Sequence, residues 1–115
     1  MVDRFKIKLL EEVVQFLDKL DEKSRDKIIY NLTKSRFSTD MELFKKLKGE
    51  IWEFRTLYNK SHFRLLAFWD KNAEIQTIVV ATHGFVKKRD KVPQSEIDKA
   101  ERIRKQYFEN KKQGK

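Results

Sequence analysis

Residues 50–69, EIWEFRTLYNKSHFRLLAFW, contain the alternation that decides the fold of this chain. Aromatic and aliphatic side chains alternate with polar ones through residues 50–58, and a similar run spans residues 62–69. A period of two residues is typical of β-strands. The polar triplet 59–61 between the runs is typical of a hairpin loop. The stretch therefore predicts two antiparallel strands whose aromatic side chains share one face.

The run that follows extends this hairpin into a meander. Residues 74–83 contain Ile78-Val79-Val80-Ala81, which is apolar on both faces and therefore typical of an interior strand. Residues 70–73 form a short polar turn before it. Three consecutive strands joined by short turns predict an antiparallel sheet.

In the N-terminal part of the chain, the spacing of the apolar residues changes after residue 9. Residues 4–9 alternate apolar and basic side chains and predict a strand. Apolar residues then recur at helical spacing over 10–20, which predicts an amphipathic helix. Asp21 is a suitable N-cap for a second helix over 22–35. Because so few residues join the two helices, we expect an antiparallel helical hairpin.

The remaining segments give weaker patterns. Apolar side chains in residues 41–47 suggest a short helical turn that ends at Gly49. Residues 86–91 form a basic loop, after which Ser95 is expected to cap a C-terminal helix. Residues 111–115 look like a frayed basic tail. The predicted order is β-α-α-β-β-β-α: an α+β fold with a small, mainly antiparallel sheet.

Composition excludes several classes of protein. With 115 residues, a single domain over 1–115 is expected. The chain has no cysteine, so disulfides, thiolate metal sites and cysteine nucleophiles are excluded. Two histidines and three glycines make a zinc site or a phosphate-binding glycine loop unexpected. Neither a membrane-spanning stretch nor a signal peptide is evident, so we expect a cytoplasmic protein with no cofactor and no membrane partner.

The charge balance is strongly basic and uneven. Lys and Arg number 27 against 18 Asp and Glu, which gives a net charge of +9. Residues 83–115 hold eleven of the basic residues and only five of the acidic ones. Such an excess attracts polyanions such as RNA, DNA or an anionic membrane. The alternative is that the charge serves solubility alone.

Two arginines stand out in the predicted hairpin. Arg55 and Arg64 each interrupt an otherwise apolar strand, and the two strands are adjacent in a hairpin. Guanidinium groups on a sheet face are suited to bind a phosphate through two hydrogen bonds. The alternative is an internal ion pair, for which Glu53 is the obvious partner.

The basic loop and the histidine before it are candidates for proton transfer. Lys87 and Lys88 follow an interior strand, and like charges this close lower the proton affinity of each other. His83 lies near the end of that strand beside a glycine, where it could donate or accept a proton. The alternatives are a solvated loop of ordinary lysines and a structural histidine hydrogen-bonded to the backbone.

Several segments resemble one known family. Residues 52–55, WEFR, resemble the "ELR" strand of HigB-like toxins in the RelE/ParE superfamily, with Phe54 in place of the usual leucine. Residues 63–68, FRLLAF, resemble the "YRV-FY" strand of these toxins. Residues 82–93, THGFVKKRDKVP, resemble the "HGF-KK---TP" segment of the phage-derived HigB branch, and residues 96–100 fit its helix start, "E-I--A". The resemblance covers nearly the whole chain.

This resemblance implies a RelE/ParE-like fold and a toxin of a type II toxin–antitoxin system. Such toxins are mostly ribosome-dependent endoribonucleases that cut mRNA in the decoding site, and cleavage through the RNA 2′-hydroxyl needs no metal. The implied partners are the ribosome, mRNA and a cognate antitoxin, which in this branch is usually a helix-turn-helix DNA-binding protein. Operator DNA would be contacted only through the antitoxin complex.

The candidate residues then take separate roles. Arg55 and Arg64 are expected to clamp phosphate and stabilise the transition state. Lys87 and Lys88 are candidates for proton transfer or phosphate neutralisation, and His83 is an acid or base candidate. A second set of basic residues is expected to hold mRNA or ribosomal RNA: Arg89, Lys91, Arg102 and Lys105.

Two other functions remain open at this level. A ParE-like toxin would inhibit DNA gyrase by binding, without nuclease chemistry, on the same fold. A noncatalytic RNA- or DNA-binding module would use the same basic residues without affecting growth. Only the site discriminates among the three, because the fold is shared.

Overall fold

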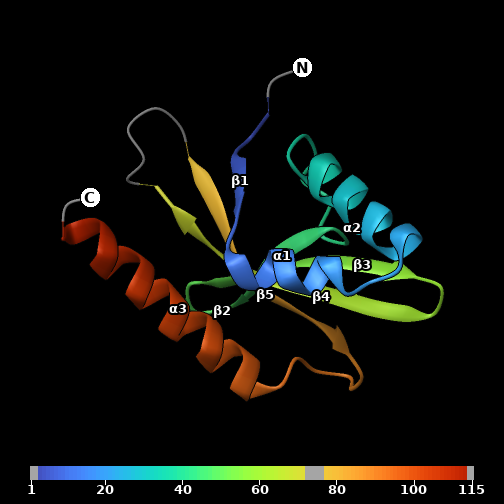
Figure 1. Cartoon of the computed structure of the whole chain (residues 1–115). Coiled ribbons are helices and arrows are strands. Elements are labelled where there is room, and N and C mark those ends of the chain that lie inside the picture. The colour runs from blue at the N-terminus through green and yellow to red at the C-terminus, as the bar shows by residue number, and fades with distance from the viewer. Residues whose placement is uncertain (1–2, 72–76, 114–115) are drawn as a thin grey trace.

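A computed structural model describes residues 3–71 and 77–113 and confirms the α+β class (Figure 1). The described elements are β1 (Lys6–Leu9), α1 (Glu11–Asp18), α2 (Glu22–Ser35), β2 (Phe44–Lys48), β3 (Ile51–Tyr58), β4 (Ser61–Asp70), β5 (Ile78–Lys87) and α3 (Gln94–Lys112). The five strands form one sheet in the order β1-β5-β4-β3-β2. β1 runs parallel to β5, and every other neighbouring pair is antiparallel.

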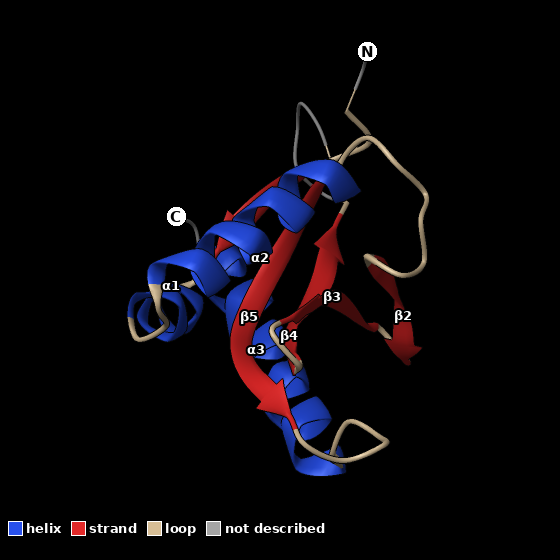
Figure 2. Cartoon of the chain, turned by 90° about the vertical axis from the view of Figure 1, so that its right-hand side faces the viewer, coloured by secondary structure: helices blue, strands red, loops and turns tan. Residues whose placement is uncertain are grey.

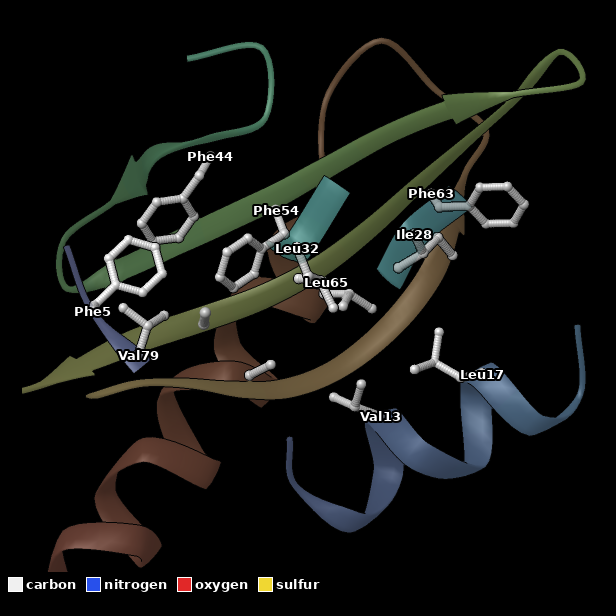
Figure 3. Packing of buried hydrophobic residues seen from close by; sticks show 12 residues of the cluster. Phe5, Val13, Leu17, Ile28, Leu32, Phe44, Phe54, Phe63, Leu65 and Val79 are labelled. Atoms are coloured by element: carbon white, nitrogen blue, oxygen red, sulfur yellow. The ribbon is translucent and has the colours of Figure 1, made fainter. Parts of the chain in front are cut away.

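Helices cover both faces of this sheet (Figures 1 and 2). The α1–α2 hairpin packs on one face, where Val13 of α1 and Ile28 of α2 meet Leu65 of β4 in the larger core cluster (Figure 3). On the other face, Ala100 of α3 packs with Phe68 of β4. The apolar residues 63 and 65–68 are therefore all buried, since β4 sends alternate side chains into two cores.

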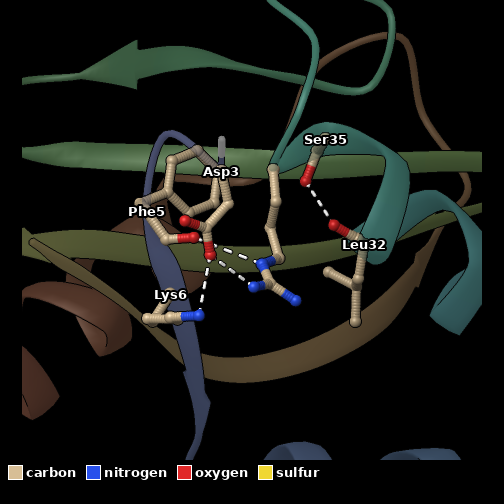
Figure 4. Close-up of polar contacts among 6 residues, drawn as sticks. Asp3, Phe5, Lys6, Leu32 and Ser35 are labelled. Carbon is tan, nitrogen blue, oxygen red and sulfur yellow. Dashed lines mark hydrogen bonds and ion pairs between the residues drawn. The ribbon is translucent and has the colours of Figure 1, made fainter. Parts of the chain in front are cut away.

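The helical hairpin is confirmed close to its predicted bounds. The carboxylate of Asp21 accepts a hydrogen bond of 3.1 Å from the amide of Ser24, as an N-cap does. At the other end of α2, Arg36 forms an ion pair with Asp3 and donates a hydrogen bond to the carbonyl oxygen of Phe5 (Figure 4). These contacts fasten the helical hairpin to the strand that precedes it.

The helical turn expected over residues 41–47 is wrong. Residues 44–48 form β2, which pairs with β3 so that Phe44 lies opposite Phe54. The ring of Phe44 stacks on Phe54 at a centroid distance of 4.3 Å and on Trp52 at 5.0 Å. Gly49, with φ of +57°, occupies the β2–β3 turn rather than a helix end. The order is therefore β-α-α-β-β-β-β-α, with one strand more than predicted.

The last strand is shifted from its predicted span. β5 covers Ile78–Lys87, whereas the expected turn residues 72–73 and strand residues 74–76 lie outside the described residues. Val86 and Lys87, expected in a loop, end the strand. Leu66 pairs with His83 but Ala67 pairs with Ala81, so Thr82 is an extra residue in a β-bulge.

The C-terminal helix differs from the prediction at both ends. Its N-cap is Pro93, and Ser95 lies inside the first turn, so capping by Ser95 is wrong. Lys111 and Lys112 belong to α3, so the frayed tail does not begin at residue 111. The ammonium of Lys111 lies 2.7 Å from a carboxylate oxygen of Asp70, to which Tyr107 also donates a hydrogen bond. Within the described residues no helix is long and apolar enough to span a membrane.

Candidate functional site

A cavity of about 500 Å³ opens between the β2–β3 hairpin, β4, the end of β5 and the start of α3. We call it the cationic basin. Its basic lining side chains are Lys45, Lys46, Lys48, Arg55, Arg64, Lys87 and Lys91. Only Glu53 and Asp90 supply opposite charge to this lining. The cavity therefore concentrates positive charge where strands β2 to β5 meet the loop before α3, which is suited to an anionic ligand.

The predicted proximity of the two arginines is confirmed. Arg55 and Arg64 lie directly opposite each other in the β3–β4 register. Strands placed this way bring side chains of the same face within about 5 Å at their β-carbons. The hairpin achieves this with a tight turn at Asn59 and Lys60, which have φ values of 51° and 67°.

Arg64 is held at the floor of the basin. Its side chain is buried, and its Nε atom lies 3.0 Å from Oε1 of buried Glu53. This contact is an ion pair and not an aligned hydrogen bond, because neither atom has a partner of acceptable geometry. Burial lowers the pKa of Arg64, and the charge of Glu53 opposes that shift. The predicted internal ion pair with Glu53 is therefore present, and it belongs to Arg64.

Arg55 makes only one long ion pair with its guanidinium group and has one donor without a partner. Its Nε atom is buried without a hydrogen-bond partner. Its Nη1 atom lies 3.9 Å from a carboxylate oxygen of Glu42, whose side chain is 86% exposed. An ion pair this long and this exposed contributes little. Arg55 is therefore the basin arginine best placed to bind an external phosphate.

The rim of the basin is tied by lysine contacts between elements. Lys48 of β2 donates a hydrogen bond of 2.9 Å to the side chain of Gln94 at the start of α3. Lys87 donates one of 3.1 Å to the backbone carbonyl of Asp90. Among the residues that the structure describes, no group of three or more His, Asp or Glu side chains is placed to hold a metal ion.

The structure separates the predicted site residues into two groups. Arg55, Arg64, Lys87 and Lys91 all line the cationic basin. The other candidates do not line it: Lys88, Arg89, His83, Arg102 and Lys105. The lysine and arginine members of this second group are exposed, and Lys105 lines a separate depression on the C-terminal half of α3.

His83 occupies a buried position between β5 and α3. Its Nδ1 atom lies 2.9 Å from the hydroxyl of Thr82, and its Nε2 atom lies 2.9 Å from a carboxylate oxygen of Glu96. Burial lowers the pKa of His83, whereas the hydrogen bond with Glu96 acts in the opposite direction. With both ring nitrogens engaged, a structural role fits this residue, and its partners are side chains and not the backbone.

Sequence reasoning missed the lysines that β2 contributes. Lys45 lies opposite Glu53 in the β2–β3 register, and Lys46 and Lys48 also line the basin. They were missed because the segment was interpreted as a helical turn. The available signal was Gly49, which separates this basic run from the alternating run that follows and is typical of a hairpin turn.

Comparison with known proteins gives one family. The family model described as "Phage derived protein Gp49-like (DUF891)" matches residues 15–105. The matched span runs from within α1 into α3 and includes every residue that lines the cationic basin. A search of curated proteins found no match.

Proposed function

We propose, since the chain belongs to the Gp49-like family of phage-derived proteins, that it is a toxin of a type II toxin–antitoxin system that cleaves mRNA on the ribosome. Family membership favours a toxin-like role. The cationic basin, with Arg55 opposite Arg64 on its floor, is the single observation that supports RNA as the target. We also propose a RelE/ParE-like topology, with the helical hairpin and α3 on opposite faces of the sheet.

The chemistry that suits this basin is internal attack within the RNA. The 2′-oxygen bonds to the adjacent phosphorus, and the bond from phosphorus to the 5′-oxygen breaks. A base removes the proton of the 2′-hydroxyl, and an acid protonates the leaving 5′-oxygen. The products are a 2′,3′-cyclic phosphate and a 5′-hydroxyl, so no water is consumed, and the basic side chains of the basin would take the place of a metal ion.

Basin residues match the charge requirements of this step. Arg55, whose ion pair with Glu42 is long and exposed, would bind the scissile phosphate, and Arg64 would add charge that is fixed in place by Glu53. Preorganised cations stabilise the charge that develops on the pentavalent phosphorus. Lys87 is the proton-transfer candidate that lines the basin, whereas Lys88 does not line it.

The proposed partners are the ribosome, mRNA and a cognate antitoxin. A single basin of about 500 Å³ does not by itself align an RNA strand, so we assign alignment of mRNA to the ribosome. A cognate antitoxin with a helix-turn-helix domain would neutralise the toxin and carry the complex to operator DNA. The exposed Arg89 and the basin residue Lys91 would add contacts to mRNA or ribosomal RNA.

Cleavage of mRNA on translating ribosomes tests the proposal. In a reconstituted translation reaction, wild-type protein should produce cut sites that primer extension detects. Arg55→Ala should reduce the cleavage rate by about a hundredfold or more, as expected for loss of a preorganised charge contact. Lys23→Ala is the matched control, because Lys23 is an exposed lysine of α2 that does not line the basin.

The alternatives predict different results in the same experiment. Gyrase inhibition without mRNA cleavage would indicate a ParE-like toxin and not a nuclease. RNA or DNA binding without cleavage, together with normal growth on expression, would indicate a noncatalytic module. Each variant should melt at the wild-type temperature, which shows that a loss of activity is not caused by unfolding.

A further inference from the structure

A second depression lies beside the cationic basin, at the end of the sheet where α3 passes the β2–β3 turn. Its volume is about 560 Å³. We call it the tryptophan groove, and the lining side chains used below are Lys46, Trp52, Trp69, Lys71, Arg104 and Phe108. The chain has two tryptophans, and both line this groove.

Aromatic rings and cations are already paired in the groove. The ring of Trp52 meets Trp69 edge to face at 5.5 Å. The ammonium of Lys71 lies 5.5 Å from the ring centre of Trp69, and the guanidinium of Arg104 lies 5.6 Å from that of Phe108. Half-buried rings beside exposed or half-buried cations are the combination that binds single-stranded nucleic acid, through base stacking and phosphate contacts.

The groove is continuous with the basin on one side and with α3 on the other. Lys46 lines both the groove and the basin. Arg104 and Phe108 also line a third depression, together with Lys105, Lys111 and Lys112 of α3. A strand whose phosphate lies in the basin therefore has a basic path to follow past Lys46 and along α3.

We infer that the tryptophan groove is a base-binding subsite for single-stranded RNA that flanks the phosphate held in the cationic basin. This inference rests on the proposed function, because it names where the same substrate continues. The volume of the groove is large enough for a nucleotide base with its sugar. Lys71 and Arg104 would neutralise the RNA phosphates next to that base. Glu50, an exposed carboxylate in the lining, opposes that binding.

The two tryptophans provide a direct assay on the unmodified protein. A non-cleavable 2′-O-methyl RNA of about 12 nucleotides, long enough to reach from basin to groove, should quench tryptophan fluorescence on binding. An oligonucleotide of about 2 nucleotides has a single internucleotide phosphate, so it should bind the basin through that phosphate and quench little. An abasic strand of the longer length separates base stacking from phosphate attraction, and should quench less than its base-bearing counterpart.

Variants that spare the basin test the groove itself. The double variant Lys71→Gln with Arg104→Gln should bind the longer RNA about tenfold more weakly than the wild type. The slope of log K against log salt should become shallower by about 1.4, because two phosphate contacts are lost. The affinity for the shorter RNA should stay unchanged. Glu50→Gln should increase the affinity for the longer RNA, because it removes a negative charge from the groove. Lys23→Ala is the control, because Lys23 is an exposed lysine of α2 that lines neither the basin nor the groove.

The outcomes separate the two levels of the proposal. The groove assignment fails if the double variant binds the longer RNA as the wild type does, or if the abasic strand quenches equally. In both cases the Arg55→Ala variant would still lose affinity, and the proposed function would stand. If wild-type protein binds neither RNA in low salt, the groove assignment fails, and cleavage of mRNA on translating ribosomes decides the proposed function separately. Tight binding of an acidic peptide with no RNA quenching would make the groove a protein interface instead.

Discussion

Replacing Gly84 with alanine should destabilise the protein, because another element closely approaches its backbone. Gly84 lies in β5 and pairs with Leu65 of β4. A Cβ atom built at this position would lie 2.5 Å from Cδ2 of Phe16 in α1 and 2.6 Å from Cδ2 of Leu65. Ordinary contact between carbon atoms is about 3.5–4.0 Å, so both side chains would have to move.

The magnitude follows from two opposing effects. Alanine in a strand restricts the unfolded chain more than glycine does, which would stabilise the fold by about 0.5–1 kcal/mol if space were available. Overpacking a filled core costs about 1–3 kcal/mol, and here the neighbours are a half-buried ring and a buried leucine. The net cost is therefore about 1–2 kcal/mol, which lowers Tm by roughly 4–8 °C in a domain of this size.

Thermal melts followed by circular dichroism measure this effect. The same substitution should cost less in a Phe16→Ala background, because the closest obstacle is then absent, and a double-mutant cycle reports that coupling. Part of the cost should remain, since Leu65 still obstructs the new methyl group. A Gly84→Ala protein that melts at or above the wild-type temperature would refute the reasoning.

Three other substitutions test contacts around the site. Glu53→Gln should cost about 3 kcal/mol in urea unfolding, because it leaves the charge of Arg64 buried without a counter-ion, and adding Arg64→Met should recover part of that loss. Burial lowers the pKa of His83 below its usual 6.5, so the unfolded chain binds the proton more readily. Wild-type stability should therefore be full above pH 6.5 and fall as the pH drops below it, and a His83→Gln protein that showed an equally steep decline would exclude this cause. Tyr107→Phe removes a 2.8 Å hydrogen bond to buried Asp70 and should cost about 1–2 kcal/mol by urea unfolding, whereas an unchanged midpoint would show that the bond is not stabilising.

The helical hairpin could be read from the sequence because its signals are local. Apolar spacing in residues 22–35 and an acceptor at Asp21 predicted α2 with the bounds that the structure shows. Helix caps and helical periodicity involve residues within a few positions of each other, so distant parts of the chain do not alter them. The antiparallel β3–β4 hairpin was predictable for the same reason, since a short turn at Asn59 and Lys60 joins its strands.

β2 was misread because its apolar spacing is ambiguous. Leu43, Phe44 and Leu47 fit one face of a helical turn, yet residues 44–48 are extended. Pairing with β3 and stacking of Phe44 on Phe54 outweigh this weak local preference. Three of the basin lysines belong to this segment, so the error in one strand concealed much of the site.

The bulge at Thr82 is a second feature that the sequence did not reveal. A run that is apolar on both faces carries no alternation, so an extra residue leaves no trace in the pattern. The bulge changes the phase of β5, so that His83 pairs with Leu66 on the face that α3 covers. Lys87 then lines the basin whereas the adjacent Lys88 does not.

The sequence by itself determined the α+β class, the basic charge with its excess in residues 83–115, and the adjacency of the strands that carry Arg55 and Arg64 within one hairpin. These properties depend on composition or on residues joined by a short turn. Tertiary structure alone decided which cations share a cavity, because strand register and a bulge set the direction of each side chain. It therefore added the β2 lysines to the cationic basin and placed His83 between β5 and α3.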